Sequence, residues 1–167
     1  MRRNFLRGIA TFTKHPIVDR GEIKFENTTN ACIYTDIKIG KDTIRIYNNH
    51  LQSLRLKERN FNFLLNEEFR QGSNRFVELK DISFKLRDAF KKRAIQVNKV
   101  ANHISKCKYP VIVCGDFNDS PISYTYHKMS KSLYDTFREV GIGIANTYMG
   151  LIPSYRIDYI LHSKQLK

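Results

Sequence analysis

Hydrophobic and polar positions alternate along two neighbouring stretches of this chain and predict a β-hairpin. Residues 32–39 and 43–50 are rich in Ile, Tyr and Thr, and one face of the first stretch is mostly apolar with a two-residue period. The sequence Gly-Lys-Asp between them, at residues 40–42, is typical of a turn. Residues 8–12 predict a further short strand, and the Asp-Arg-Gly at residues 19–21 predicts a second turn.

The clearest helical pattern lies in the middle of the chain. Apolar residues recur there at three- and four-residue spacing, with Lys, Arg and Asn on the opposite face. These apolar residues are Leu86, Phe90, Ala94, Val97, Ala101 and Ile104. The preceding residues 51–81 are polar and charged with scattered aromatics, which predicts a loop or an irregular helical insertion.

Downstream of this helix, a short apolar strand leads directly into a polar loop. Residues 111–114 are wholly apolar and are expected to be covered on both faces. The loop Gly-Asp-Phe-Asn-Asp-Ser-Pro follows at residues 115–121, and Ser123 is expected to cap a short helix. Residues 156–161 predict the last strand. With no repeats and no clear boundary, we expect one domain over residues 1–167.

Composition and charge narrow the classes of partner. The chain has 29 Lys and Arg against 16 Asp and Glu, a net charge of +13, which favours nucleic acid, phosphorylated ligands or an acidic membrane surface. Solvated helix faces that serve only solubility explain the charge equally well. No apolar run is long enough to cross a bilayer, the start lacks a secretory signal, and the many branched and aromatic residues argue against disorder.

The three cysteines show no pattern of a disulfide framework or a zinc site. Cys32, Cys107 and Cys114 are odd in number and include no Cys-x-x-Cys pair. Two of them lie within apolar stretches, so buried reduced thiols are the better interpretation. Reduced thiols favour a reducing compartment, and we therefore expect the cytoplasm or the cytoplasmic face of a membrane.

The loop after the apolar strand carries the clearest candidate for chemistry. Asp116 and Asn118 are two residues apart, so in an extended backbone both side chains point to the same side. The aspartate could orient or deprotonate a water or hold a hard cation, and the asparagine could donate to a phosphoryl oxygen. The alternative is a turn in which both side chains bind their own backbone.

Two further candidates lie at strand positions. His50 ends a predicted strand, where it could donate to a phosphoryl oxygen or leaving group, or could be satisfied by local hydrogen bonds. Asp158 lies among apolar residues of the last strand, and a buried carboxylate needs a partner. That partner could be the nearby Arg156 or a catalytic histidine held in one tautomer.

Four motifs follow one another along the chain: GIATFTKHPI at residues 8–17, NNHL at 48–51, VIVCGDFNDSP at 111–121 and RIDYIL at 156–161. Together they resemble motifs of the endonuclease/exonuclease/phosphatase superfamily, which includes deoxyribonuclease I, abasic-site endonucleases and neutral sphingomyelinases. Thr13 stands where that family usually has Ser, a change that keeps the hydroxyl. The GDFN motif followed by RIDYIL is the most specific part of the resemblance.

Two further motifs of that family have no match in this chain. The family has a metal-binding Glu upstream of the first motif, whereas Glu22 and Glu26 follow it here. It also has a Ser-Asp-His motif after the RIDYIL strand, and no Ser-Asp-His occurs in these 167 residues. The resemblance thus implies a fragment that is incomplete at both ends and whose metal ligands are unknown. Related full-length proteins sometimes carry N-terminal membrane helices.

The fold that the resemblance implies belongs to the α+β class. It is a four-layer α/β/β/α sandwich like that of deoxyribonuclease I, in which two mostly antiparallel sheets pack together. The site would lie at one edge of the sandwich, where the loops at the strand ends converge. A fragment of such a fold would leave unpaired strand edges, which favour association.

The reaction that the resemblance implies is phosphoester hydrolysis with Mg²⁺ or Mn²⁺ as cofactor. Asp116 would orient or deprotonate the attacking water, and Asn118 would fix that water or a phosphoryl oxygen. His50 would donate to the phosphoryl group, and Asp158 would orient a terminal histidine that this chain lacks.

The implied substrate is a phosphoester, and the motifs do not separate nucleic acid from lipid or sugar phosphates. Without the upstream Glu and the terminal histidine, we expect the fragment itself to be weak or inactive. The alternative hypothesis is a non-catalytic basic nucleic-acid-binding module. It explains the net charge but leaves the GDFN motif and Asp158 without a role.

Overall fold

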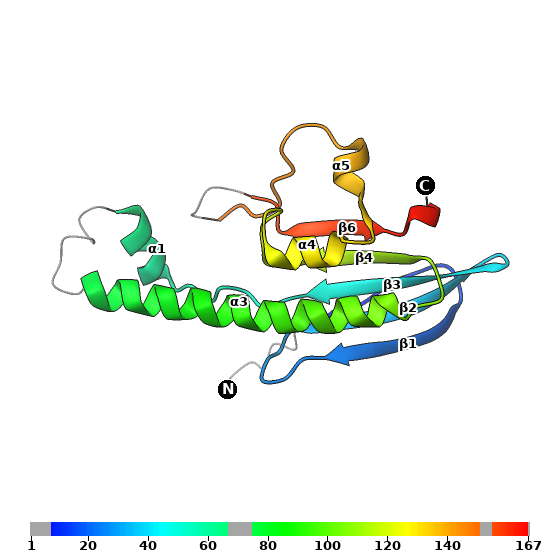
Figure 1. Ribbon diagram of the computed structural model, residues 1–167, viewed down its shortest axis with the longest axis horizontal. Coiled ribbons are helices and arrows are strands. Elements are labelled where there is room, and N and C mark those ends of the chain that lie inside the picture. Colours follow the sequence, from blue (N-terminus) through cyan, green and yellow to red (C-terminus); the bar gives the residue numbers. More distant parts are fainter. Residues whose placement is uncertain (1–7, 67–74, 151–154, 167) are drawn as a thin grey trace.

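The computed structural model describes residues 8–66, 75–150 and 155–166. These residues form a six-stranded mixed sheet with helices packed against it (Figure 1). The elements in chain order are β1 (Ile17–Lys24), β2 (Ala31–Ile39), β3 (Asp42–His50), α1 (Glu58–Leu65), α3 (Arg75–Ser105), β4 (Val111–Asp116), α4 (Tyr124–Ser130), β5 (Tyr134–Asp135), α5 (Thr136–Val140), β6 (Asp158–His162) and the 3-10 helix η1 (Lys164–Leu166).

The strand order brings together segments that are far apart in the sequence. The sheet runs β1-β2-β3-β4-β6-β5, and every neighbouring pair is antiparallel except β3 and β4, which are parallel. A parallel pair needs a long crossover connection, which α1 and α3 provide here. β3 and β4 therefore end at the same edge of the sheet. β6 begins at that edge, because it is antiparallel to β4.

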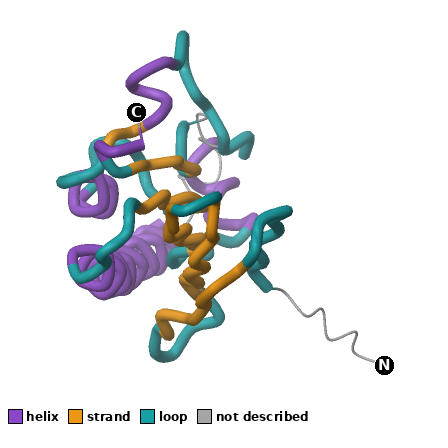
Figure 2. Tube along the Cα trace, turned by 90° about the vertical axis from the view of Figure 1, so that its right-hand side faces the viewer, coloured by secondary structure: helices purple, strands orange, loops and turns teal. Residues whose placement is uncertain are grey.

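One face of the sheet packs against α3 and forms most of the core. Val97 and Val100 of α3 are fully buried, as are Tyr47, Val113 and Leu161 of the sheet. Figure 2 shows α3 nearly end-on beside one face of the strands. At about 1.5 Å per residue, the 31 residues of α3 make it much longer than the strands it covers. Its first turns, together with α1, extend past the edge at which β3 ends (Figure 1).

The structure confirms the predicted hairpin and corrects two local predictions. β2 and β3 pair in register from Ala31 with His50 to Ile39 with Asp42. The strand predicted at residues 8–12 is wrong, since these residues adopt no regular structure. The turn predicted at residues 19–21 is also wrong, because these residues lie within β1 and pair with β2. Pairing along the sheet thus overrides a local preference for a turn.

The predicted central helix is confirmed within α3, but its buried face is rotated from the predicted one. Phe90, expected in the core, is 52% exposed, whereas Ala89, Arg93 and Gln96 are buried. Arg93 and Gln96 accept burial because they make hydrogen bonds in the core, which an apolar pattern does not record. The predicted insertion at residues 51–81 contains α1 and the start of α3, and part of it lies outside the described residues.

The mostly antiparallel sheet with flanking helices agrees with the predicted α+β class. The second sheet of the expected four-layer sandwich is not among the residues that the structure describes. Over those same residues, no helix combines the length and the apolar character needed to cross a membrane. All three cysteines are free thiols, but only Cys32 is buried, whereas Cys107 and Cys114 are partly exposed.

A buried ion pair fixes the chain just before β6. Arg156 donates to both carboxylate oxygens of Asp135, at 3.0 and 2.6 Å, and Tyr126 donates its hydroxyl to the same carboxylate at 2.7 Å. Burial alone would raise the pKa of Asp135, but these hydrogen bonds hold it below the ordinary value. Arg156 is therefore not the partner of Asp158, which was one of the two alternatives left open by the sequence.

We expect Asp135→Asn to lower the free energy of unfolding by about 3 kcal/mol, because it leaves the Arg156 guanidinium buried without a counter-charge. The asparagine can still accept the hydrogen bond from the Phe137 backbone N–H, so the cap of α5 is kept. Urea unfolding followed by circular dichroism measures the change. In the control, Asp88→Asn breaks an exposed ion pair with Lys92 and should cost about 0.5 kcal/mol or less. Equal losses in the two variants would contradict this account.

Candidate functional site

Three of the four candidate residues lie in one row across adjacent strands. His50 ends β3, Asp116 ends β4 and Asp158 begins β6, and Asp116 is the register partner of both other residues. Register partners project from the same face of a sheet, and neighbouring strands lie about 4.8 Å apart. The sheet therefore gathers an imidazole and two carboxylates from three separate segments. We call His50, Asp116 and Asp158 the polar row.

A glycine allows β3 and β4 to approach each other at this row. Gly115 has a φ of +123°, a backbone conformation that side chains other than that of glycine rarely adopt. A Cβ atom at this position would lie 2.1 Å from the Asn49 carbonyl oxygen on β3. The close approach of the β3 and β4 backbones therefore requires glycine at position 115, the first residue of the GDFN motif. Asp116 follows directly, so this approach also sets its position.

The turn after β4 links Asn118 to Asp116. The Asn118 backbone N–H donates to Asp116 Oδ1 at 2.7 Å, and its side-chain Nδ2 donates to Asp116 Oδ2 at 3.1 Å and to the Leu51 carbonyl at 2.9 Å. Asn118 has a φ of 51°, so the backbone is not extended here. The turn that the sequence analysis gave as the alternative interpretation is therefore present. Its hydrogen bonds also orient the side chains of Asp116 and Asn118 next to His50 and Asp158.

Asp116 is partly buried, and its pKa lies above the ordinary value. Burial is the main cause, because it penalises the charged carboxylate, and the negative charge of Asp158 raises the pKa further. The Asn118 backbone N–H, His50 and Arg93 act in the opposite direction. These couplings show that the three members of the row share one electrostatic environment. A carboxylate with a raised pKa is suited to accept a proton from water.

Asp158 is exposed, which corrects the sequence-based expectation of a buried carboxylate. Exposed and buried residues alternate along β6, and Asp158 lies with the exposed Ile160 on the open face, whereas Tyr159 and Leu161 face the core. Its backbone N–H donates to Thr147 Oγ1 at 3.0 Å, as does the N–H of Ile157. Thr147 therefore holds the start of β6 in place while the carboxylate remains open to a ligand.

A buried arginine that the sequence analysis did not select ties the two loops of the site together. Arg93 of α3 is 1% exposed, donates to the Gln52 carbonyl at 2.7 Å and forms an ion pair with Asp119 at 3.0 Å. Gln52 lies two residues after His50, and Asp119 directly follows Asn118. The sequence carried no signal for this role, because arginine is expected on the polar side of a helix and the burial of Arg93 depends on hydrogen bonds to distant segments.

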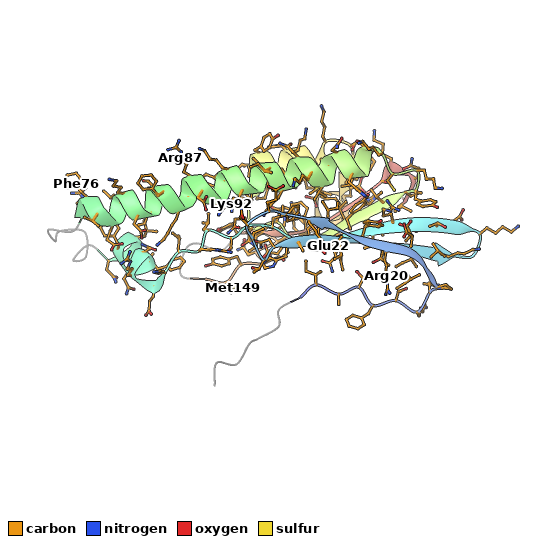
Figure 3. All side chains as sticks on the ribbon, turned by 90° about the horizontal axis from the view of Figure 1, so that it is seen from below. Arg20, Glu22, Phe76, Arg87, Lys92 and Met149 are labelled. Carbon is orange, nitrogen blue, oxygen red and sulfur yellow. The ribbon has the colours of Figure 1, made fainter. Side chains whose placement is uncertain are left out.

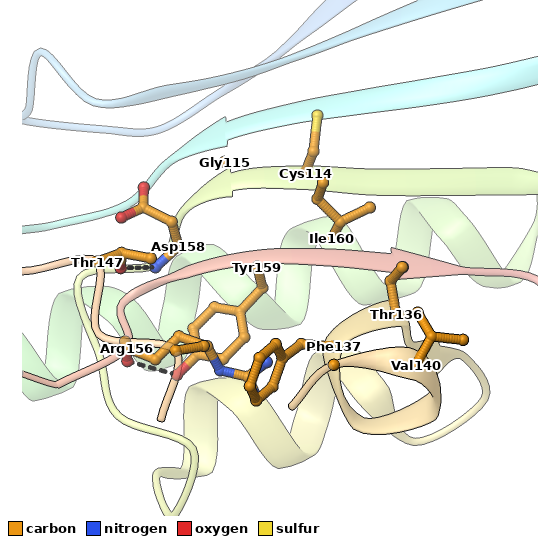
Figure 4. Close-up of a pocket in the computed structure, with 12 residues that line it drawn as sticks. Cys114, Gly115, Thr136, Phe137, Val140, Thr147, Arg156, Asp158, Tyr159 and Ile160 are labelled. Atoms are coloured by element: carbon orange, nitrogen blue, oxygen red, sulfur yellow. Dashed lines mark hydrogen bonds between the residues drawn. The ribbon is translucent and has the colours of Figure 1, made fainter. Parts of the chain in front are cut away.

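Two cavities flank the polar row. The cavity beside β6 has a volume of about 590 Å³ and is largely apolar, and Figure 4 shows Asp158 and Thr147 at one end and Val140 of α5 at the other. The second cavity, of about 780 Å³, is more polar and is lined by residues that include His50 and Glu22. A ligand at the row would thus find apolar contacts on one side and polar contacts on the other.

The donor atoms of the row suit one class of metal better than others. Within residues 8–66, 75–150 and 155–166, no group of three or more His, Cys, Asp or Glu side chains is arranged to hold a metal ion. The row supplies two carboxylates, Asp116 and Asp158, with the Asn118 amide beside them. Mg²⁺ takes oxygen ligands, keeps several waters and is often held by one or two carboxylates and a substrate phosphate. These donors therefore fit Mg²⁺ better than Zn²⁺, which prefers Cys and His.

Comparison with known proteins identifies the family of this chain. A family model described as "Endonuclease/Exonuclease/phosphatase family" matches residues 6–167. A search of curated proteins finds no match.

Solved structures with the same fold include three of low sequence identity. The human Nocturnin catalytic domain with bound sulfate has a TM-score of 0.53 and 21% identity, over 89% of this chain and 48% of that one. D. rerio TDP2 complexed with single-strand DNA product has a TM-score of 0.55 and 15% identity, over 89% and 54%. Sphingomyelinase C from Streptomyces griseocarneus has a TM-score of 0.54 and 16% identity, over 91% and 51%. This chain thus spans about half the length of these structures.

Substitution of Gly115 by alanine tests the close approach of β3 and β4. We expect Gly115→Ala to lower the free energy of unfolding by about 3 kcal/mol, because the methyl group overlaps the Asn49 backbone and the residue must keep a positive φ. Gly40→Ala is the matched control, because Gly40 also has a positive φ but open space around it, so about 1 kcal/mol is expected. Equal losses of unfolding free energy in the two variants, measured with urea, would show that the close approach of β3 and β4 at Gly115 does not contribute to stability.

Titration of the Asp116 carboxyl by ¹³C NMR tests the coupling within the row. We expect a pKa above the ordinary aspartate value, lowered by Asp158→Asn because a negative charge is removed, and raised by His50→Ala because a positive charge is removed. Since the folded-state pKa is raised, the stability linked to Asp116 is present at low pH and is lost as the pH rises through that pKa. Asp88→Asn, on the exposed surface of α3, should leave the titration unchanged. A titration insensitive to Asp158 and His50 would contradict the shared site.

Proposed function

This chain belongs to the Endonuclease/Exonuclease/phosphatase family, and we propose that its polar row hydrolyses phosphoesters with the help of a divalent cation. The observation that carries the proposal is the register of three strands, which aligns His50, Asp116 and Asp158 at one edge of the sheet. Two acids and an imidazole beside an amide provide a proton acceptor, a proton donor and hard oxygen ligands in one place.

Each member of the polar row, and Asn118 beside it, has a distinct proposed role. Asp116 orients the attacking water and accepts its proton, a role that its raised pKa supports. Asn118, held against Asp116 by two hydrogen bonds, fixes the water or a phosphoryl oxygen. His50 donates to the phosphoryl group as negative charge develops. Asp158, whose carboxylate is exposed, orients a histidine from outside this chain in one tautomer.

A bound Mg²⁺ or Mn²⁺ would supply charge neutralisation at the phosphoryl group. We assign no ligand of this ion among the described residues, because Asp116 and Asp158 carry the two roles given above and no group of three or more metal-binding side chains lies together there. Two hydrogen bonds from Asn118 orient the Asp116 carboxylate, so its oxygen atoms are positioned before any ligand binds.

Two pairs of observations support different classes of substrate. The net charge of +13 and the match to a TDP2 structure with a DNA product support nucleic acid. The apolar cavity beside Asp158 and the match to a sphingomyelinase support a phosphoester with an apolar group. A non-catalytic nucleic-acid-binding module remains the second candidate, favoured by the charge alone.

Asp116→Ala in the longest natural protein that contains this chain tests the reaction. With Mg²⁺ present, we expect hydrolysis to fall about a thousandfold, because the proton acceptor is lost. The substrates are bis(p-nitrophenyl) phosphate, a single-stranded oligonucleotide and sphingomyelin, each assayed with and without Mg²⁺. The chain of 167 residues assayed alone should be weak, because it carries no Ser-Asp-His sequence.

Circular dichroism of Asp116→Ala establishes that the fold is retained, and Asp88→Ala on the far surface of α3 is the control for removal of an acid. Hydrolysis by Asp116→Ala at the wild-type rate would rule out the proposed role. Salt-dependent binding of DNA by the natural protein, without Mg²⁺-dependent hydrolysis of any of the three substrates, would favour the binding module.

A further inference from the structure

The outward face of α3 carries a stripe of interspersed apolar and basic side chains along its first two thirds. Successive members are three or four residues apart, which places them on one face of the helix. The members of this stripe are Phe76, Lys80, Phe84, Arg87, Lys91 and Ile95. All are exposed, and Phe76 is 83%, Phe84 57% and Ile95 61% exposed. We call these six residues the outer stripe.

The outer stripe takes no part in the core or in the polar row. The buried residues of α3, such as Ile82, Ala89 and Val97, lie on the opposite side of the helix. Figure 3 shows Phe76 and Arg87 on the side of α3 that faces away from α1 and the sheet. Two largely exposed phenyl rings on one helix face are a costly arrangement in water, and such surfaces commonly mark a contact with a partner.

The outer stripe carries net positive charge. It contains three cations and no acid, whereas the acids of the same part of α3 lie to its sides and engage other cations. Asp81 binds Lys85 at 2.6 Å, and Asp88 binds Lys92 at 2.8 Å. Within the stripe, Lys80 lies over the Phe84 ring, with 5.9 Å between its Nζ and the ring centroid. The complement of this surface is an anionic surface that also accepts apolar groups.

We propose that the outer stripe docks on the surface of an anionic lipid bilayer. The phenyl rings and Ile95 would enter the boundary between headgroups and acyl chains, and the three cations would contact anionic headgroups. Helices that bind membranes in this way combine Lys and Arg with exposed Phe and Leu, and they require no matching groove on the partner. The long Lys and Arg stems can reach outward to the headgroups while the rings lie deeper.

Other partners fit the outer stripe less well, because they match either its positive charge or its exposed apolar side chains but not both. A second copy of the stripe would bring like charges together, which opposes self-association. Nucleic acid would match the cations, but proteins that stack bases on aromatic rings do so within grooves, and this stripe is a convex helix face. The stripe begins where α3 extends past the end of β3 (Figure 1).

Co-sedimentation of this chain with lipid vesicles tests the proposal without any measurement of hydrolysis. We expect binding to vesicles of phosphatidylcholine with phosphatidylserine, weakened by salt, and little binding to phosphatidylcholine alone. Lys80→Gln with Arg87→Gln should weaken binding about 25-fold, because each cation near an anionic surface contributes about a fivefold factor. Lys38→Gln with Lys41→Gln removes the same charge from the end of β2 and the turn after it, and should change binding by less than about twofold.

A second pair of variants tests the apolar members. Phe76→Ser with Phe84→Ser should weaken vesicle binding at least about tenfold, because two phenyl rings are no longer transferred from water into the bilayer. Ile142→Ser with Ile144→Ser removes two side chains that are 96% and 86% exposed outside the stripe and should leave binding unchanged. Circular dichroism checks that every variant keeps its helical content.

Three results would overturn the proposal. Equal losses in the stripe variants and their controls would show that vesicle binding follows overall charge or overall exposure. Binding to an oligonucleotide that depends on the stripe, without vesicle binding, would assign the stripe to nucleic acid. A dimer in analytical ultracentrifugation that the stripe variants dissociate would assign it to a second copy of the chain.

Discussion

The parallel contact between β3 and β4 determines where the chemistry of this protein lies. Two parallel strands end at the same edge of a sheet, and this pair carries His50 and Asp116 as its final residues. The strands can meet there only because Gly115 has no side chain to collide with the Asn49 backbone. β6 then adds Asp158 from the far end of the chain, so the pairing of three strands assembles a site from residues 50, 116 and 158.

The buried Arg93 connects the two loops at the polar row, although burial disfavours its charged guanidinium. Burial lowers the pKa of the guanidinium, and the charge and hydrogen bond of Asp119 oppose that effect. Because Arg93 also binds the Gln52 carbonyl, one side chain connects the segments that follow His50 and Asn118. The long helix thus serves both as the crossover that makes β3 and β4 parallel and as the support behind their ends.

Local patterns predicted the elements that depend on local interactions. The hairpin, the apolar strand before GDFN and the Ser123 cap all follow from neighbouring residues, and the structure contains each of them. The ordered motifs also indicated the four candidate residues, although their register could not be read from the sequence. Long-range effects explain the errors: pairing with β2 places residues 19–21 in a strand, and Asp158 lies on the face of β6 that does not pack against the core.

The central claim is that the polar row acts as one unit on a phosphoester, and a double-mutant cycle measures this directly. The rates of Mg²⁺-dependent hydrolysis are compared for His50→Ala, Asp158→Ala and the double variant, in the longest natural protein that contains this chain. Groups that act in the same transition state are not independent, so we expect the double variant to lose far less than the product of the two single losses. Losses that multiply, or variants that keep the full rate, would contradict the claim.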